Sequence, residues 1–298
     1  MIMGKEVGIV VVTYNRLQLL KEVIESLRKQ AFQDFQIIVV NNGSTDETSQ
    51  WLLDQKDIYT ITQKNLGGAG GFFTGMKYVA ENEYRYCWIM DDDVICDRNA
   101  LAELLKVHSD IDNVGFVCSS VFAPNGLAMN SPHIDCRNNL NSYPGWYDII
   151  DKGAIKVDAA TFVSVLFTTD LIRKIGLPYK EFFIWGDDSE YTSRISAKYP
   201  CFMAINSRVI HKRKVSQSLS FLQENDSCRL KFFYYKFRNE SFVHRIRNHG
   251  IRKYSFMLQY LRTMAICFIK LDFRRLSILL RSKFAAITFN PQIFFPNK

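Results

Sequence analysis

The sequence has no cysteine pattern typical of a zinc ribbon or of a small domain held by disulfides. Its 298 residues include seven cysteines, which form no Cys-x-x-Cys pair and no regular spacing. Scattered cysteines of this kind suit a reducing compartment. The opening stretch MIMGKEVGIVVVTYN also lacks the charged segment, long apolar core and small-residue cleavage site of a secretory leader. We therefore expect a cytoplasmic protein.

The chain also lacks an apolar run long enough to cross a bilayer. A membrane-spanning helix needs about 20 mostly apolar residues, and the longest apolar window, 254–271, is interrupted by Arg262 and Lys270. No glycine-rich segment has the Walker pattern or the G-x-G-x-x-G spacing of a dinucleotide site. With 47% hydrophobic and 23% charged residues, the composition is that of a globular protein with a substantial core.

Positive charge is concentrated toward the C-terminus. Of 38 Lys and Arg residues, 14 lie between Arg229 and Lys283, where the acidic residues are Glu240 and Asp272. The remainder of the chain holds 24 basic and 28 acidic residues. We expect the basic segment and the mildly acidic remainder to have different roles.

The first 90 residues alternate between strand and helix patterns. Near-continuous apolar runs are typical of strands buried on both faces, and an apolar spacing of three and four is typical of a helix. The expected strands lie at 7–15, 35–40, 58–62 and 86–90, and the expected helices at 16–30 and 71–81, with another helix after NNGSTDET capped by Ser44 or Thr45. This order predicts an α/β fold with a mainly parallel sheet, right-handed crossovers and flanking helices.

A short polar cluster follows each of the four expected strands, at 13–16, 41–46, 65–71 and 91–93. The carboxyl ends of parallel strands lie at one edge of a sheet, where α/β proteins bind their ligands. We therefore expect the four clusters to converge on one rim.

Three consecutive aspartates, Asp91 to Asp93, end the fourth expected strand. Like charges this close raise each other's pKa, unless a cation offsets them. Residues two apart at a strand end point the same way, so Asp91 and Asp93 are expected to share one side while Asp92 points away. Their hard oxygen ligands suit Mg²⁺ or Mn²⁺ bridging to a diphosphate. The alternative is an acidic loop that only caps the next helix, expected at 99–108.

The stretch NLGGAGGF (65–72) has four glycines in five positions. Such a loop lets backbone N–H groups approach an anion, and the following helix adds its dipole. On this interpretation Asn65, Gly67 and Gly68 contact the anion. A tight turn between strand and helix explains the glycines equally well.

A second acidic pair lies in EFFIWGDDSEYTSRI (181–195), where Asp187 and Asp188 open an expected helix. Capping of the helix N-terminus would explain one carboxylate. The second, behind an apolar wall, is suited to act as a general base toward a hydroxyl. Farther on, His211 ends a strand-like run, and its interest depends on whether it folds back onto the aspartate triplet.

Taken together, VVVTYNR, VVNNGSTDET, NLGGAGGF, WIMDDDV, FFIWGDDSEY and YYKFRN appear in an order that resembles family 2 glycosyltransferases of the GT-A fold. More narrowly, they are similar to the bacterial galactofuranosyltransferases and rhamnosyltransferases. The resemblance covers about residues 7–240. It implies a catalytic domain over 1–225, with a nucleotide-sugar half of about 1–120 and an acceptor half of about 121–225. A basic helical region then spans 226–298.

The resemblance also implies roles for individual residues. It places the divalent cation, Mn²⁺ or Mg²⁺, on Asp91, Asp93 and His211, and it makes Asp188 the catalytic base. Asp187 and Trp185 would bind the acceptor. The nucleotide-sugar residues would be Thr13, Arg16, Asn41, Asn65, Gly67, Gly68 and Asp92. Many relatives have Asp-Asn where this chain has Asn41-Asn42, which removes an ionic contact and leaves both UDP and dTDP open as the nucleotide.

The predicted reaction is an inverting transfer. A cation at the aspartates offsets the charge that builds on the leaving diphosphate. The acceptor hydroxyl attacks from the opposite face while Asp188 takes its proton. The expected donor is UDP-galactofuranose and the expected acceptor a lipid-linked cell-surface glycan such as O-antigen, with dTDP-rhamnose as the alternative donor.

Two other classes of function remain open at this stage. A nucleotidyltransferase shares a similar nucleotide-binding half, although VVTYNRLQ offers no glycine-rich loop with a basic residue after the first strand. A nucleic-acid binder would use the basic tail, but the charges there alternate with Leu, Ile and Met at helical spacing, so we expect no nucleic acid partner.

The C-terminal stretches 228–250 and 251–284 are helical in pattern, aromatic and basic. This composition is typical of an interfacial helix drawn to anionic lipid. Packing of a solvated helical bundle on the catalytic domain is the alternative, and the two are compatible. The sequence thus predicts a peripheral protein on the inner face of the cytoplasmic membrane. The segment 122–160 has the Pro, Gly and Asn content of a long excursion beside the site.

Overall fold

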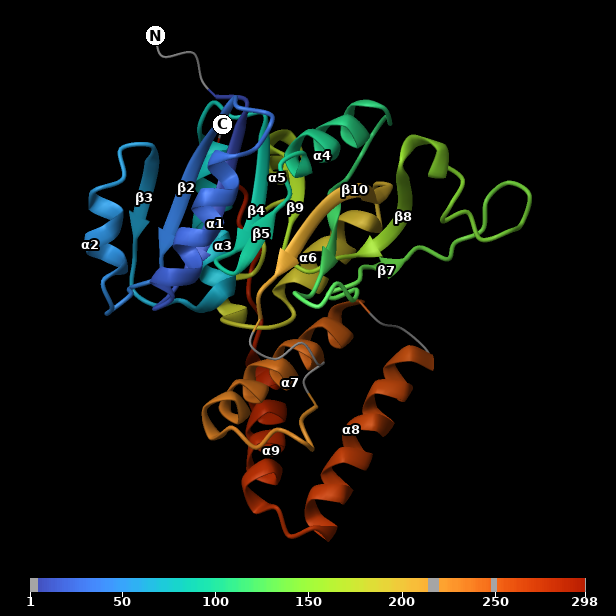
Figure 1. Cartoon of the computed structure of the whole chain (residues 1–298). Helices are drawn as coiled ribbons and strands as arrows, with labels where there is room; N and C mark the ends of the chain where they lie inside the picture. Colours follow the sequence, from blue (N-terminus) through green and yellow to red (C-terminus); the bar gives the residue numbers. More distant parts are fainter. Residues whose placement is uncertain (1–4, 214–219, 248–250, 298) are drawn as a thin grey trace.

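The computed structural model describes residues 5–213, 220–247 and 251–297. One large twisted sheet, flanked by helices, occupies the upper part of the molecule, and three helices hang below it (Figure 1). Residues 248–250, within the predicted helical stretch, lie outside the described residues.

The first half of the sheet is parallel, as predicted. Its strands lie in the order β3-β2-β1-β4, and their neighbours pair in parallel register. The strands are β1 (Val7–Thr13), β2 (Phe35–Asn41), β3 (Ile58–Thr62) and β4 (Tyr86–Asp91), and the helices between them are α1 (Leu17–Arg28), α2 (Thr48–Leu53) and α3 (Gly67–Glu81). Both faces of β1 are covered, so all seven of its residues are buried.

Two of these helices begin elsewhere than predicted. Helix α3 begins at Gly67 instead of 71, because glycines let its first turns lie directly on the sheet: a Cβ on Gly71 would come within 2.3 Å of a Val12 methyl group. Helix α2 begins at Thr48, without a side-chain cap from Ser44 or Thr45. Those two hydroxyls bond to Asn15 instead, across the rim.

The second half of the sheet is mixed. The order continues β4-β9-β6-β10-β8-β7, with β9 antiparallel to both of its neighbours and β6 parallel to β10. The elements are β5 (Val94–Cys96), α4 (Ala100–Ser109), β6 (Val117–Phe122), β7 (His133–Ile134), β8 (Ala154–Ala159), β9 (Val165–Thr168), α5 (Thr169–Ile175), α6 (Asp187–Ser196) and β10 (Cys201–His211). Strand β5 pairs with the end of β10 and so brings His211 opposite Val94.

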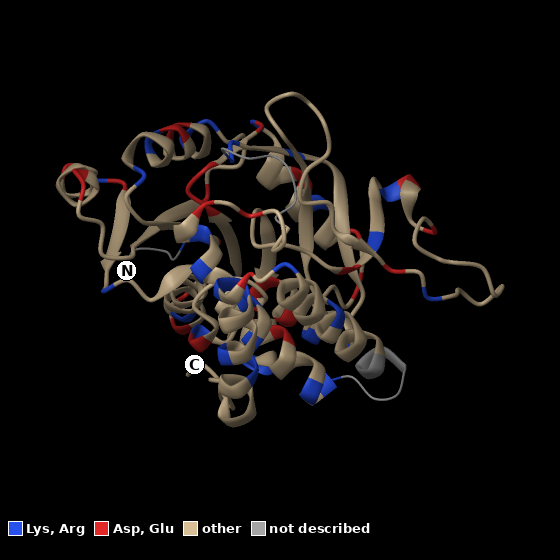
Figure 2. Cartoon of the chain, turned by 90° about the horizontal axis from the view of Figure 1, so that it is seen from below, with Lys and Arg blue, Asp and Glu red and all other residues tan. Residues whose placement is uncertain are grey.

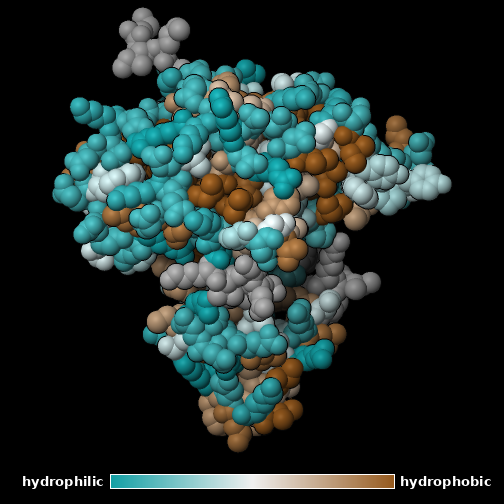
Figure 3. Space-filling model, viewed as in Figure 1, coloured by the Kyte–Doolittle hydropathy of each residue, from teal (hydrophilic) through white to brown (hydrophobic). Residues whose placement is uncertain are grey.

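The C-terminal region consists of α7 (Ser227–Arg247), α8 (Ile251–Ile269) and α9 (Phe273–Thr288). They share an apolar core that includes Phe233, Tyr260 and Leu279. Seen from below, this region carries many Lys and Arg residues (Figure 2), and its lower end is hydrophobic (Figure 3). Among the described residues no helix is both long enough and apolar enough to span a membrane.

Candidate active site

The polar clusters at the strand ends meet, as predicted, on one rim of the sheet. The Asn15 carboxamide accepts a hydrogen bond from the Thr45 N–H at 2.7 Å, which joins the first cluster to the second. The Asn42 Nδ2 donates to the Gly67 carbonyl at 2.7 Å and joins the second to the third. The Thr13 hydroxyl donates to Asp92 at 2.8 Å and joins the first cluster to the fourth.

Asp91, Asp93 and His211 form a compact group at this rim. One ligand atom from each lies within 4.8 Å of the other two, and Asp93 and His211 are buried. The capping alternative does not hold, because α4 begins at Ala100, beyond β5, and its N-cap position is Asn99. The sequence predicted that Asp91 and Asp93 lie on one side. The pairing of β5 with β10 brings His211 next to them.

The donor atoms in this group fit a divalent cation. His211 Nδ1 lies 2.9 Å from the Asn130 side-chain oxygen, an acceptor that favours a proton on Nδ1, so the neutral imidazole would offer its Nε2 lone pair to a cation. Nε2 faces Asp93 Oδ1 at 3.0 Å, and no hydrogen bond from the described residues reaches that buried oxygen. Two lone pairs this close repel each other unless a proton or a cation lies between them. Asn130 is a residue that sequence reasoning missed, because it lies 81 positions from its partner.

Asp92 lies outside this group, but its carboxylate contacts the same Arg16 nitrogen as that of Asp93. It binds Thr13 and also Arg16, whose guanidinium lies 3.1 Å from Asp92 and 2.9 Å from Asp93. Burial raises the pKa of Asp92 to about 6, against the opposing effects of Arg16 and Thr13. Arg16 is half-exposed, so its free edge faces the space where an anionic ligand would lie.

Burial and the neighbouring charges shift the pKa values of all three residues of the group. Burial, and then the neighbouring Asp93 charge, raise the pKa of Asp91. Burial also opposes ionisation of Asp93, but His211 and Arg16 outweigh it and lower the Asp93 pKa. Burial likewise disfavours the protonated imidazole, yet the contact with Asp93 and the charge of Asp91 raise the His211 pKa. A bound cation would favour the ionised form of both carboxylates and the neutral form of the imidazole.

The second acidic pair follows a tight and unusual turn. Phe183 and Trp185 have φ values of 65° and 63°, in the left-handed region that non-glycine residues seldom adopt, and Gly186 follows at 90°. Gly186 occupies the N-cap of α6, so neither aspartate caps the helix. Burial raises the pKa of Asp188, although the Ser189 N–H bonds its carboxylate at 2.7 Å. Burial and then the Asp188 charge raise the pKa of Asp187.

Asn239 of α7 holds this turn in place. Its buried carboxamide donates to the carbonyls of Phe182, Ile184 and Trp185 at 3.0, 3.3 and 2.8 Å. The neighbouring Arg238 donates to the Glu181 carbonyl at 2.6 Å and to Asn239 itself at 2.8 Å. Arg238 and Asn239, the last two residues of the motif YYKFRN, therefore fix the turn that presents Trp185 and the acidic pair.

The turn also lies against the start of α3. The Ala69 N–H donates to the Phe183 carbonyl at 3.2 Å, and a Cβ on Gly67 would lie 2.0 Å from that oxygen. Gly67 has a φ of 73°, so glycine is required there on both counts. The glycine stretch and the turn at 182–186, which we call the acceptor turn after its predicted role, are thus in direct contact.

The remaining predicted site residues have ordinary surroundings. The Asn41 side chain is buried and already bonded to Ser44 and Ser49, and the Asn65 side chain accepts from the Gly67 N–H. Gly68 has open space where a side chain would extend. Among the described residues, no hydrogen bond or ion pair joins Asp188 to the Asp91–Asp93–His211 group.

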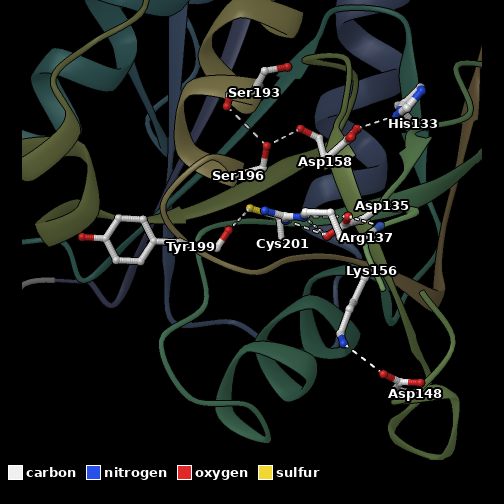
Figure 4. Close-up of polar contacts among 10 residues, drawn as sticks. All are labelled: His133, Asp135, Arg137, Asp148, Lys156, Asp158, Ser193, Ser196, Tyr199 and Cys201. Atoms are coloured by element: carbon white, nitrogen blue, oxygen red, sulfur yellow. Dashed lines mark hydrogen bonds and ion pairs between the residues drawn. The ribbon is translucent and has the colours of Figure 1, made fainter. Parts of the chain in front are cut away.

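The excursion at 122–160 divides into two parts. Asn130 lies at the rim, whereas the later residues form a projecting loop beside β7 and β8 (Figure 1). Lys156 of β8 pairs with Asp148 of that loop at 3.3 Å, and Ser196 of α6 donates to the Asp158 carbonyl of β8 at 2.6 Å (Figure 4).

Comparison with known proteins finds a matching family and several relatives of this chain. The sequence model of the family "Glycosyl transferase family 2" matches residues 8–176. The chain is 27% identical over 199 residues to galactofuranosyltransferase GlfT1 of Mycolicibacterium smegmatis, an alignment that covers 62% of this chain and 64% of that protein. It is 26% identical over 277 residues to GlfT1 of Mycobacterium tuberculosis, covering 84% and 85% of the two chains.

A solved structure shares the fold. The mannosyltransferase PcManGT from Pyrobaculum calidifontis, in complex with GDP-Man and Mn²⁺, superimposes with a TM-score of 0.54 at 16% identity. The superposition covers 96% of this chain and 76% of that one. The predicted α/β fold of the GT-A type is therefore confirmed.

Proposed function

The chain belongs to glycosyl transferase family 2, and from that premise we propose that it is a metal-dependent, inverting galactofuranosyltransferase. Its donor would be UDP-galactofuranose, and its acceptor a hydroxyl of a lipid-linked cell-surface glycan. The sugar rests on the two GlfT1 relatives, each named as a galactofuranosyltransferase. The observation that carries the proposal is the group formed by Asp91, Asp93 and His211 on the rim.

We assign some residues of the rim to the sugar donor and others to the acceptor. Asp91, Asp93 and His211 would hold Mn²⁺ or Mg²⁺, which offsets charge on the diphosphate of the donor. Arg16, half-exposed beside them, adds a positive charge for the same diphosphate. Asn65, Gly67 and Gly68 lie at the start of α3, where the helix dipole would favour an anion, although the Gly67 N–H is already bonded to the Asn65 side chain.

On the acceptor side, Trp185 and Asp187 would orient the hydroxyl and Asp188 would take its proton as the new glycosidic bond forms. Because burial raises the pKa of Asp188, the carboxylate is a stronger base than one in water. A single displacement of the diphosphate inverts the anomeric centre and needs no covalent nucleophile. Trp185 packs on Phe232 and Phe233, so apolar side chains line one side of the turn.

The proposal is tested by measuring sugar transfer from a panel of UDP- and dTDP-sugars, with Mn²⁺ or with EDTA, on the wild type and on Asp188→Ala. We expect Mn²⁺-dependent turnover of UDP-galactofuranose that is lost in the variant while nucleotide binding persists. Turnover of dTDP-rhamnose, and not of UDP-galactofuranose, would show that rhamnose is the transferred sugar. Binding of no nucleotide sugar by calorimetry would overturn the proposal as a whole.

A further inference from the structure

The end of the C-terminal region where α8 passes into α9 exposes a group of large apolar side chains. Phe268, Ile269, Leu271 and Phe273 are 63%, 79%, 67% and 62% exposed. This group, the α8–α9 tip, forms the hydrophobic lower end of the molecule in Figure 3. Leu258 and Leu261 extend it along the outer side of α8 at helical spacing. The opposite side of that helix, with Tyr260 and Cys267, packs into the core of the region.

One residue of the tip occupies a position that normally favours glycine. Leu271 lies in the turn that follows α8, two residues past Ile269, with a φ of 54°, and the next N–H, that of Asp272, bonds back to the Cys267 carbonyl at 2.9 Å. Helices that end in this way commonly have glycine at the left-handed position, because a side chain there is strained. Here the strained position carries a leucine whose side chain is mostly in solvent. Its side chain contributes little to the fold, so strain at an exposed apolar residue indicates a role outside the fold.

The charges around the tip are positive. Lys270 and Arg274 are exposed beside it, and Arg262 is exposed higher on α8. The single carboxylate of the tip, Asp272, caps α9 and pairs with Arg275, so its charge is already offset. A second copy of the same tip would bring like charges together, whereas an anionic lipid surface would attract them. Lys and Arg beside apolar side chains are typical of interfacial segments in anionic bilayers.

The tip also faces in the direction that the proposed reaction needs. Figure 1 shows the carboxyl ends of β1, β2 and β3 pointing toward the C-terminal region, with the α8–α9 tip at the far end of that region. A surface that binds the tip therefore lies on the same side as the rim that carries Asp91. Helix α7 connects the two, since Asn239 holds the turn at Trp185 and Phe233 joins the core shared with α8 and α9.

We propose that the α8–α9 tip inserts into an anionic lipid bilayer, with Phe268, Ile269, Leu271 and Phe273 in the acyl-chain boundary and Lys270 and Arg274 at the headgroups. The tip thereby holds the active-site rim toward the lipid surface. The membrane contact itself does not depend on the donor sugar; only its use for a lipid-linked acceptor rests on the proposed function.

The test is partition of the purified full-length protein onto vesicles of phosphatidylcholine with 30–50% phosphatidylglycerol, or of phosphatidylcholine alone, measured by flotation. We expect binding to the anionic vesicles, reduced about tenfold or more in Phe268→Ser/Leu271→Gly and in Lys270→Glu/Arg274→Glu. Leu271→Gly alone removes apolar surface while relieving strain, so its loss of binding comes without loss of thermal stability. The matched control, Leu53→Ser/Leu140→Ser, alters two exposed leucines of the catalytic domain and is expected to bind like the wild type.

Insertion is distinguished from surface attraction by Phe268→Trp, whose fluorescence brominated acyl chains should quench, with Leu140→Trp as the unquenched control. Equal vesicle binding by the tip variants and the wild type would overturn the proposal. So would a shift from dimer to monomer in the tip variants without any change in vesicle binding, since the tip would then join two chains. Sugar transfer to a soluble acceptor, measured in parallel, reports the proposed function separately, because the tip variants leave the rim intact.

Discussion

The carboxamide of Asn239 donates a hydrogen bond to the carbonyl of Trp185 across 2.8 Å, and so joins the first helix of the C-terminal region to the acceptor turn. That turn contains two non-glycine residues in the left-handed region, a conformation that persists only where the surroundings hold it. Asn239 is therefore a positioning residue for Trp185 and for the acidic pair that follows.

Replacement of this side chain should loosen the turn. Asn239→Ala leaves three carbonyls without their donor, and the loss of buried hydrogen bonds should cost about 1–3 kcal/mol in the free energy of unfolding. Turnover should fall much more than nucleotide affinity, because the turn presents the acceptor residues. The control, Asn82→Ala, removes an exposed side-chain bond to the Tyr78 carbonyl and should change little. Equal losses of turnover and nucleotide affinity would point to a general loss of folding instead.

Adjacent glycines at the start of α3 offer a matched pair. Gly67→Ala places a Cβ 2.0 Å from the Phe183 carbonyl oxygen, at a φ of 73°, and the backbone strain alone should cost roughly 1–3 kcal/mol. Gly68→Ala meets no atom within 4 Å and should be neutral or stabilising by up to about 1 kcal/mol, since alanine favours the helix. Urea unfolding of both variants measures the difference. Similar midpoints for the two would contradict the contact between α3 and the acceptor turn.

The proposed metal site at Asp91, Asp93 and His211 predicts that Mn²⁺ raises the free energy of unfolding, which can be measured without substrate. Mn²⁺ at a hundred times its dissociation constant should stabilise the wild type by about 3 kcal/mol. Asp93→Asn should lose most of this increment, because Asp93 Oδ1 is the buried oxygen that lacks a hydrogen bond. Asp97→Asn removes an exposed carboxylate of the same segment and should keep the increment. Each protein is compared with itself, with and without Mn²⁺, by thermal unfolding; an undiminished increment in Asp93→Asn would argue against this site.

The catalytic base predicts the pH dependence of transfer. Asp188 must be ionised to accept a proton, and burial raises its pKa. The rate should therefore fall as the pH drops through a midpoint above the ordinary aspartate value of about 3.9. Asp188→Asn should abolish this activity at every pH. Asp170→Asn, which changes an exposed carboxylate in the first turn of α5, should keep the wild-type profile. Profiles of kcat over about pH 5–9 make the measurement, and a flat acid side would count against Asp188.

Local pattern determined much of the fold. Apolar runs such as 35–40 predict strands because only a buried strand tolerates so many consecutive apolar side chains. Parallel pairing then places the strand ends, and with them Asp91 and Asp93, on one rim. These predictions need only neighbours in sequence and the general geometry of a parallel sheet.

Helix boundaries at the rim were harder to predict, because distant residues set them. Thr45 looked like a helix cap, yet Asn15, 30 positions away, takes its hydrogen bonds, and α2 begins at Thr48. Gly67 starts α3 four positions early because the helix lies against the Phe183 carbonyl. A capping preference is worth only about 1 kcal/mol, so such tertiary contacts override it.

The sequence by itself determined which carboxylates and which histidine to consider, the order of strands and helices in the first 90 residues, and the basic character of the C-terminal region. Tertiary structure alone decided that Asn130 would orient His211, that Asn239 would hold Trp185, and that Leu271 would stand exposed at the end of α8. Each of these facts depends on pairing across a loop or a domain, or on what the fold leaves uncovered. Such long-range geometry has no signature in the spacing of neighbouring residues, because it is set by the packing of the whole chain.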